Sequence, residues 1–180
     1  VLCVGKLSQP RKNQPAVAEA LREAGASGRA RLILAGSTGA ARGESADHLA
    51  RLEAAAAAES WIELRRDVPF AEMPALYAAA DICVLPSVGE PLGSAPVEAM
   101  AYGAVPVIST GAGSAGYLHH ERDGLRVDVE TPGALQAALA HLVADAPNRA
   151  RLAAGARATA AEELVTDRFL DRIAALAAEG

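Results

Sequence analysis

The stretch DICVLPS, residues 81–87, carries the uninterrupted apolar run ICVL between an aspartate and a proline–serine pair. A strand that is apolar on both faces is typical of the interior of a parallel sheet, whereas an antiparallel sheet with one wet face alternates apolar and polar residues. Segments with the spacing of amphipathic helices flank this strand on both sides. The stretch therefore predicts a central strand of a doubly wound α/β sandwich with a parallel sheet.

The same succession of strand and helix runs along the whole chain. Short apolar runs predict further strands at 1–5, 31–36, 61–64, 105–110 and 125–129. Helical spacing predicts helices at 16–24, 46–58, 72–80, 96–102, 132–144, about 148–164 and 167–178. We therefore expect one Rossmann-like domain over residues 1–180. Ligands of such sheets bind beyond the carboxyl ends of the strands, so the loops that follow them should converge on one crevice.

Composition and net charge limit the kinds of molecule that this protein is expected to bind. The chain has 180 residues, of which 51% are hydrophobic, and its net charge is −5. This charge provides no general attraction to nucleic acid or to an anionic membrane, so any bound anion must be held locally. The apolar runs are strand-sized or rich in alanine, which predicts a cytoplasmic protein without a membrane span. The chain opens on VLCVG without an initiator methionine, and we therefore expect a piece of a longer protein.

The segment GEPLGSAPVEAMAYGAVPV, residues 89–107, places Glu90 and Glu98 with seven residues between them. A helix is expected to begin here, with Ser94 as its cap. Its amino end would lie at the carboxyl edge of the sheet, where unpaired N–H groups favour phosphate. Carboxylates repel phosphate but accept hydrogen bonds from hydroxyl groups. The layout therefore favours a diphosphate with a hydroxyl-rich ring at each end, as in a nucleoside diphosphate sugar.

Three segments carry a resemblance to a known family. EPLGSAPVEAMAYGAVPVIS (90–109) closely resembles the E-x7-E segment of the family 4 glycosyltransferases, which are retaining enzymes with the two-Rossmann-domain architecture called GT-B. VGKLSQPRKN (4–13) is similar to the first loop of that family, and MPALYAAADICVLPS (73–87) to the helix and strand before the acidic motif. The resemblance covers nearly the whole chain. It implies the C-terminal, donor-binding domain of an enzyme that moves a sugar to an acceptor hydroxyl.

By this resemblance, two acids and a basic pair would surround the donor. Glu90 would contact the donor sugar, and Glu98 would bind the ribose hydroxyls. Arg11 and Lys12 would neutralise the diphosphate leaving group, on which negative charge grows as the anomeric bond breaks. The resemblance thus implies that Glu90, Arg11 and Lys12 are catalytic.

Further donor contacts are implied in the same way. The family usually has arginine where this chain has Lys6, and lysine keeps the charge but lacks the planar fork for bidentate phosphate contact. The base, of UDP or GDP, would rest on the turn around Val68 and Met73. Backbone and side-chain contacts to phosphate would come from Gly5, Lys6, Leu92, Gly93 and Ser94.

We expect no metal and no other cofactor, because fixed cations would stabilise the leaving group. The histidines form no ligand spacing with cysteines or acids; they are His48, His119, His120 and His141. The implied partners are a nucleotide sugar and a missing N-terminal acceptor domain, against which the terminal helices at about 148–180 would pack. Any peripheral membrane contact would belong to that missing domain, and the chain alone is expected to be inactive.

Other interpretations remain open. Glu90 and Glu98 can also be read as a loop acid and a solvated helix acid. GAGSAG, residues 111–116, matches G-x-G-x-x-G and invites an NAD-binding oxidoreductase domain built on Gly111, Gly113 and Gly116. The following YLHHERDG is too short for the usual crossover helix, which counts against that hypothesis. A third possibility is a nucleotide-binding module without catalysis.

Overall fold

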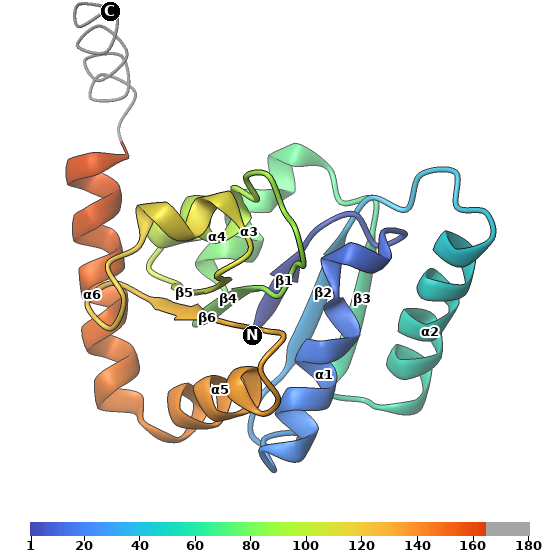
Figure 1. Ribbon diagram of the computed structural model, residues 1–180, viewed down its shortest axis with the longest axis horizontal. Coiled ribbons are helices and arrows are strands. Elements are labelled where there is room, and N and C mark those ends of the chain that lie inside the picture. The colour runs from blue at the N-terminus through green and yellow to red at the C-terminus, as the bar shows by residue number, and fades with distance from the viewer. Residues whose placement is uncertain (165–180) are drawn as a thin grey trace, which may run out of the picture.

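The computed structural model describes residues 1–164, and its centre is a sheet with helices on both faces (Figure 1). The order of the six strands is β3-β2-β1-β4-β5-β6, and every neighbouring pair is parallel. The doubly wound parallel sheet predicted from sequence is therefore confirmed. The strands are β1 (Leu2–Val4), β2 (Leu32–Gly36), β3 (Ile62–Arg66), β4 (Ile82–Leu85), β5 (Val105–Ser109) and β6 (Leu125–Val127).

Within residues 1–164, six α-helices and three 3₁₀ turns accompany these strands, and the last two α-helices follow β6. The α-helices are α1 (Gln14–Glu23), α2 (Glu44–Ala58), α3 (Met73–Ala78), α4 (Ala95–Ala101), α5 (Ala134–Ala144) and α6 (Ala146–Glu163). The 3₁₀ turns are η1 (Pro10–Lys12), η2 (Phe70–Glu72) and η3 (Gly113–Tyr117). Sequence spacing found each α-helix within a few residues and missed the 3₁₀ turns. It also ended β3 at Leu64, whereas the ladder with β2 continues to Arg66. The helix predicted at 167–178 lies outside the described residues.

The core explains why the sheet is buried on both faces. All four residues of β4 are buried, as the run ICVL predicted. Val84 belongs to the apolar cluster that includes residues of α1 and α5, whereas Cys83 belongs to the cluster that includes residues of α3 and α4. Full burial of one such aliphatic side chain contributes about 1.5–3 kcal/mol. No helix within residues 1–164 combines the length and the hydropathy that a membrane crossing requires.

The strand order creates a switch point between β1 and β4. From β1 the chain moves to β2 on one side of the sheet, while β4 lies on the other side of β1. The loops that leave the carboxyl ends of these two central strands therefore diverge, and the rule for such sheets places the ligand crevice where the order reverses. The segments that sequence analysis singled out, residues 4–13 and 90–109, both begin at this point.

Candidate active site

Two loops meet at the switch point. We call residues 5–12, after β1, the basic loop, and residues 86–94, after β4, the acidic loop. The backbone N–H of Val88 donates to the carbonyl oxygen of Arg11 at 2.9 Å. The side-chain amide of Asn13 donates to the carbonyl oxygen of Pro86 at 3.3 Å. These contacts hold two segments together that lie far apart in the sequence.

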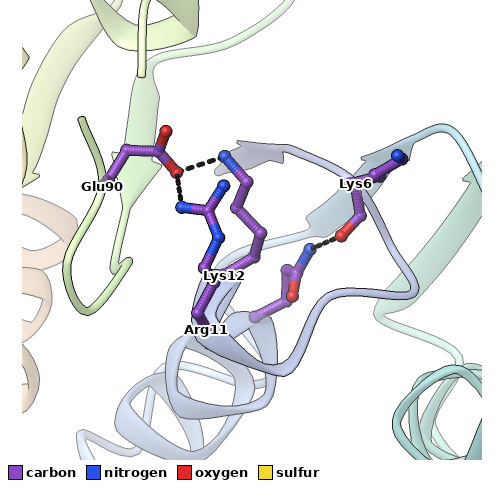
Figure 2. Close-up of polar contacts among 5 residues, drawn as sticks. Lys6, Arg11, Lys12 and Glu90 are labelled. Atoms are coloured by element: carbon purple, nitrogen blue, oxygen red, sulfur yellow. Dashed lines mark hydrogen bonds and ion pairs between the residues drawn. The ribbon is translucent and has the colours of Figure 1, made fainter. Parts of the chain in front are cut away.

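Glu90 is the point at which the charges of the two loops meet. Arg11 Nη1 lies 2.8 Å from Glu90 Oε2, and Lys12 Nζ donates to the same oxygen (Figure 2). One carboxylate therefore faces two cations across the crevice. From sequence, the cations were expected on a diphosphate and the carboxylate on a sugar. In this structure the three side chains bind one another.

The environment of Glu90 keeps it ionised. Its side chain is largely buried, with 9% of the residue exposed. Burial raises the pKa of the carboxyl, but the hydrogen bonds and charges of Lys12 and Arg11 outweigh that effect, so the net pKa lies below its usual value. Glu90 is consequently a full negative charge at neutral pH. An anion that approaches Arg11 and Lys12 must compete with it.

The backbone of Glu90 fixes a third segment, GAGSAG. The N–H of Glu90 donates to Gly111 O at 3.1 Å, and its carbonyl oxygen accepts from Gly113 N–H at 2.9 Å. A Cβ atom at Gly113 would overlap the carbonyl oxygen of Pro91, so only glycine permits this approach. The segment runs into η3, a five-residue 3₁₀ helix, and not into the long helix that a dinucleotide-binding fingerprint opens. The NAD hypothesis is therefore not favoured.

The turn before α4 presents free backbone donors. Gly93 adopts a φ of +77°, and a Cβ there would collide with Leu85. Within residues 1–164, no acceptor is found for the backbone N–H groups of Leu92, Gly93 and Ser94. Leu92 and Ser94 are exposed and Gly93 is partly exposed. A Cβ at Gly93 would lie 3.0 Å from Cγ of Glu90, so these three successive donors lie beside the residue that binds Arg11 and Lys12, where an anion can be held.

Glu98, on α4, is held by two hydroxyl groups. Ser94 Oγ donates to Glu98 Oε1 at 2.5 Å, and Tyr77 Oη donates to Oε2 at 2.7 Å. Burial and the neighbouring Glu98 raise the pKa of Tyr77. Ser94 is the cap residue of α4, as predicted, but its hydroxyl donates to Glu98 and accepts from no backbone N–H of the helix. Nothing in the sequence marked Tyr77 as the partner of Glu98.

Lys6 does not join the other two cations. Figure 2 shows its side chain directed away from Glu90. Gly39 lies in the loop after β2. The Cε atom of Lys6 lies 3.8 Å from the place that a Cβ atom would occupy if Gly39 had a side chain. Gly5 lies where β1 ends, and its N–H donates to Ala35 O at 3.0 Å. The structure thus brings Arg11 and Lys12 together and leaves Lys6 on the other side of the basic loop.

The segment around Val68 and Met73 follows β3, farther along the sheet. Both side chains are partly buried and pack against the apolar cluster that contains Tyr77. Beside them, the carboxylate of Asp67 accepts the N–H and the hydroxyl of Thr38, each at 2.8 Å. These hydrogen bonds hold the pKa of Asp67 below its usual value. They fix the loops after β2 and β3 to each other, which the sequence did not indicate.

Among residues 1–164, no cluster of three or more His, Cys, Asp or Glu side chains with the geometry of a metal site is found. The charged groups of the crevice are instead the basic pair, Glu90 and Glu98. Together with the free N–H groups of residues 92–94, they offer donors for an anion and two acceptors for hydroxyl groups.

Comparison with known proteins identifies relatives of this arrangement. Residues 1–145 match the family described as "Glycosyl transferases group 1". A D-inositol 3-phosphate glycosyltransferase from Salinispora tropica is 39% identical over 87 residues, which cover 48% of this chain and 18% of that protein. A glycogen synthase from Geotalea daltonii is 41% identical over 76 residues, which cover 39% of this chain and 16% of that protein. The matched segments thus span less than a fifth of these relatives.

Solved structures share the fold over nearly the whole chain. Alr3699/HepE from Anabaena, crystallised in complex with UDP, has a TM-score of 0.78 at 24% identity and covers 99% of this chain. The match spans 49% of the Anabaena chain. The C-terminal domain of a group 1 glycosyl transferase, LpcC from Francisella tularensis, has a TM-score of 0.77 at 18% identity, with coverage of 92% of this chain and 86% of that domain.

Proposed function

This chain belongs to the group 1 glycosyltransferases, and we propose that it forms the C-terminal, donor-binding domain of a retaining enzyme. The parent reaction moves a sugar from a nucleoside diphosphate sugar to an acceptor hydroxyl, keeps the anomeric configuration and needs no metal. The acceptor site belongs to a separate N-terminal domain. Without that domain, the chain binds the donor and transfers little or no sugar.

The proposal rests on one observation, the pair of cations at the switch point. Arg11 and Lys12 face a single carboxylate oxygen of Glu90, and the side chain of Glu90 lies against Gly93, in the turn whose N–H groups at residues 92–94 are free. A diphosphate carries more negative charge than one carboxylate and can span both groups of donors. It therefore displaces Glu90 from the two cations.

Once Glu90 is displaced, the two cations and the carboxylate each have a separate role in the reaction. As the bond between the anomeric carbon and the phosphate oxygen breaks, negative charge grows on the diphosphate, and Arg11 and Lys12 stabilise it more strongly than they stabilise the ground state. Glu90, once released, accepts a hydrogen bond from a hydroxyl of the donor sugar. No metal is required for charge neutralisation, because the two side chains supply it.

The rest of the donor follows from the positions of the other residues. Glu98, oriented by Ser94 and Tyr77, accepts hydrogen bonds from the ribose hydroxyls. The base lies against Val68 and Met73, beyond the carboxyl end of β3. Gly5 and Lys6 approach the phosphates through the backbone at the end of β1, because the Lys6 side chain points elsewhere. The Anabaena protein of the same fold was crystallised with UDP and with UDP-glucose, so UDP is the first nucleotide to test.

The test is calorimetric titration of the chain with UDP, GDP, ADP and NAD in the presence of a chelator. We expect one nucleoside diphosphate to bind. Lys12→Ala removes a charge-assisted contact to phosphate and should weaken binding about tenfold or more. Arg22→Ala, which removes a cation paired with Glu59 elsewhere on the surface, is the matched control and should leave affinity unchanged.

Glu98→Gln separates the ribose role from a general loss of charge. It should weaken the binding of UDP but not that of 2′,3′-dideoxyuridine diphosphate, which lacks the hydroxyls that Glu98 accepts from. Saturable binding of NAD alone, indifferent to Lys12→Ala and Glu98→Gln, would overturn the proposed function. Binding of a nucleoside diphosphate only when a divalent cation is supplied would overturn the proposed metal independence.

A further inference from the structure

A buried pair of polar side chains lies behind the basic loop. Gln14, the first residue of α1, is fully buried. Its amide nitrogen donates to the carbonyl oxygen of Lys6 at 3.2 Å, a contact drawn in Figure 2. Its amide oxygen lies 3.0 Å from Nε2 of His48, which belongs to α2 and is 6% exposed. A chain of two hydrogen bonds therefore runs from α2 through α1 to the basic loop.

These two hydrogen bonds determine which ring nitrogen of His48 carries a hydrogen. Because the nitrogen of Gln14 donates to a carbonyl, its oxygen must be the acceptor, and His48 must carry a hydrogen on Nε2. Burial lowers the pKa of His48, aided by the charge of Arg51 and opposed by that of Glu44. The neutral ring with its hydrogen on Nε2 satisfies the contact at neutral pH. A buried histidine and a buried glutamine thus satisfy each other.

The carbonyl oxygen of Lys6 links the Gln14 side chain to the backbone of the basic loop. It also accepts the backbone N–H of Gln9 at 3.2 Å, which shapes the turn that leads into η1. A Cβ at Gly5 would lie 3.3 Å from Cδ of Lys12 and 3.7 Å from Nε2 of Gln14, so the stem of Lys12 and the Gln14 amide flank the same stretch of backbone. A shift of Gln14 therefore moves the backbone on which the Lys12 side chain rests.

We propose that Gln14 and His48 are positioning residues of the donor site, which hold the basic loop so that Arg11 and Lys12 meet the diphosphate. The inference rests on the proposed function, since it assigns the two residues to the same site. Neither residue touches the donor. They act through the backbone of Lys6, and the loss of either leaves the other with an unsatisfied buried polar atom.

Three variants test this role by calorimetric titration with UDP and with uridine. His48→Leu and Gln14→Leu remove the hydrogen bonds and should weaken UDP binding about tenfold, by the net value of a buried hydrogen bond and its unsatisfied partner. Uridine affinity should stay unchanged, because uridine has no phosphate to meet the basic loop. His48→Gln places an amide N–H where Nε2–H lies and should restore UDP affinity. His141→Leu, near the carboxyl end of α5, is the matched histidine control.

Hydrogen exchange on the same variants separates positioning from general destabilisation. The amides of Gly5, Leu7 and Lys12, which hold the basic loop by donating to the carbonyl oxygens of Ala35, Ser37 and Gln9, should exchange faster in His48→Leu, while the amides of α5 keep their rates. Equal acceleration throughout the chain, or an equal loss of affinity for UDP and uridine, would overturn the positioning role. If the unaltered chain binds UDP and His48→Leu binds it as tightly, this inference alone fails. If the unaltered chain binds no nucleoside diphosphate, the proposed function fails and the inference with it.

Discussion

Two buried carboxylates, Glu90 and Asp123, lie in different loops of this molecule, one after β4 and the other before β6, and are used in opposite ways. Glu90 meets two cations through one oxygen. Asp123 has no exposed surface, and its Oδ1 accepts the backbone N–H of His119 at 2.8 Å. Its Oδ2 accepts from Thr159 Oγ1 at 2.8 Å and lies 2.8 Å from His119 Nδ1.

The partners decide what each carboxylate can do. Arg11 is 42% exposed along its side chain, so an anion from solvent can reach it and exchange with Glu90. Asp123 itself has no exposed surface, and the hydroxyl of Thr159 that donates to it is buried on α6, so a solute cannot replace it even though the His119 side chain is 46% exposed. The difference teaches that accessible partners leave a carboxylate open to exchange with a solute, whereas enclosed partners make it part of the architecture.

The largest effect is expected at Asp123. Asp123→Ala leaves the buried hydroxyl of Thr159 and the N–H of His119 without an acceptor, and it should lower the free energy of unfolding by about 3 kcal/mol in urea denaturation. Asp128→Ala removes an exposed aspartate that also accepts from its own loop, and it should cost well under about 1 kcal/mol. The comparison breaks if folded Asp123→Ala has lost its nucleotide affinity, because Asp123 would then belong to the site.

A smaller loss of stability is expected at the other end of the same contact. Thr159→Val keeps the shape of the side chain but removes one of the donors to Asp123, so the free energy of unfolding should fall by about 1 kcal/mol. Thr159→Ser keeps the hydroxyl and should retain the hydrogen bond. Equal stability of Thr159→Val and the unaltered chain would show that this hydrogen bond adds nothing to the net stability of the fold.

The third prediction concerns Glu90 and has the opposite sign. Glu90→Gln removes the charge that competes for Arg11 and Lys12, so the affinity for UDP should rise about threefold, or about 0.7 kcal/mol. Glu63→Gln is the control, because Glu63 also pairs with two arginines but lies on β3. A fall in UDP affinity on Glu90→Gln would mean that the carboxylate holds the basic loop in place and is not displaced.

The smallest expected effect is a change in the pKa of Glu90 when UDP binds. The pKa of Glu90 lies below its ordinary value of 4.5, so its ion pairs stabilise the fold above that pH, and this stabilisation is lost as the pH falls through the lower folded value. Binding of UDP should withdraw Arg11 and Lys12 and so raise the pKa of Glu90. Carboxyl ¹³C signals followed against pH, with Glu90→Gln for assignment, measure both values. An unchanged pKa on saturation with UDP would contradict the exchange.

Features that depend on local composition were predictable. The run ICVL is apolar on both faces, and it is a central buried strand because burial on both faces requires that composition. Convergence of residues 5–12 and 86–94 followed from the rule that ligands bind at the carboxyl edge of such a sheet. The roles given to Glu90, Glu98, Arg11 and Lys12 as donor contacts came from resemblance, and they remain predictions.

Other features were not predictable because their partners come from distant elements. Tyr77 lies 21 positions from Glu98, His48 lies 34 from Gln14, and Thr159 lies 36 from Asp123. No spacing rule links such residues. The hydroxyl of Ser94 also depends on its neighbourhood, since it donates to the Glu98 carboxylate and accepts from no backbone N–H of α4.

The amino-acid sequence by itself determined the strands, the helices and the edge of the sheet where the charged loops meet, because periodicity and burial act over a few neighbouring residues. Only the tertiary structure decided that Glu90 pairs with both Arg11 and Lys12, that Lys6 turns away, and that α2 reaches the basic loop through two buried side chains. Those contacts depend on how far each helix is shifted and rotated on the sheet. The packing of the whole core sets these quantities, and a hydrogen bond needs them to within a few tenths of an ångström.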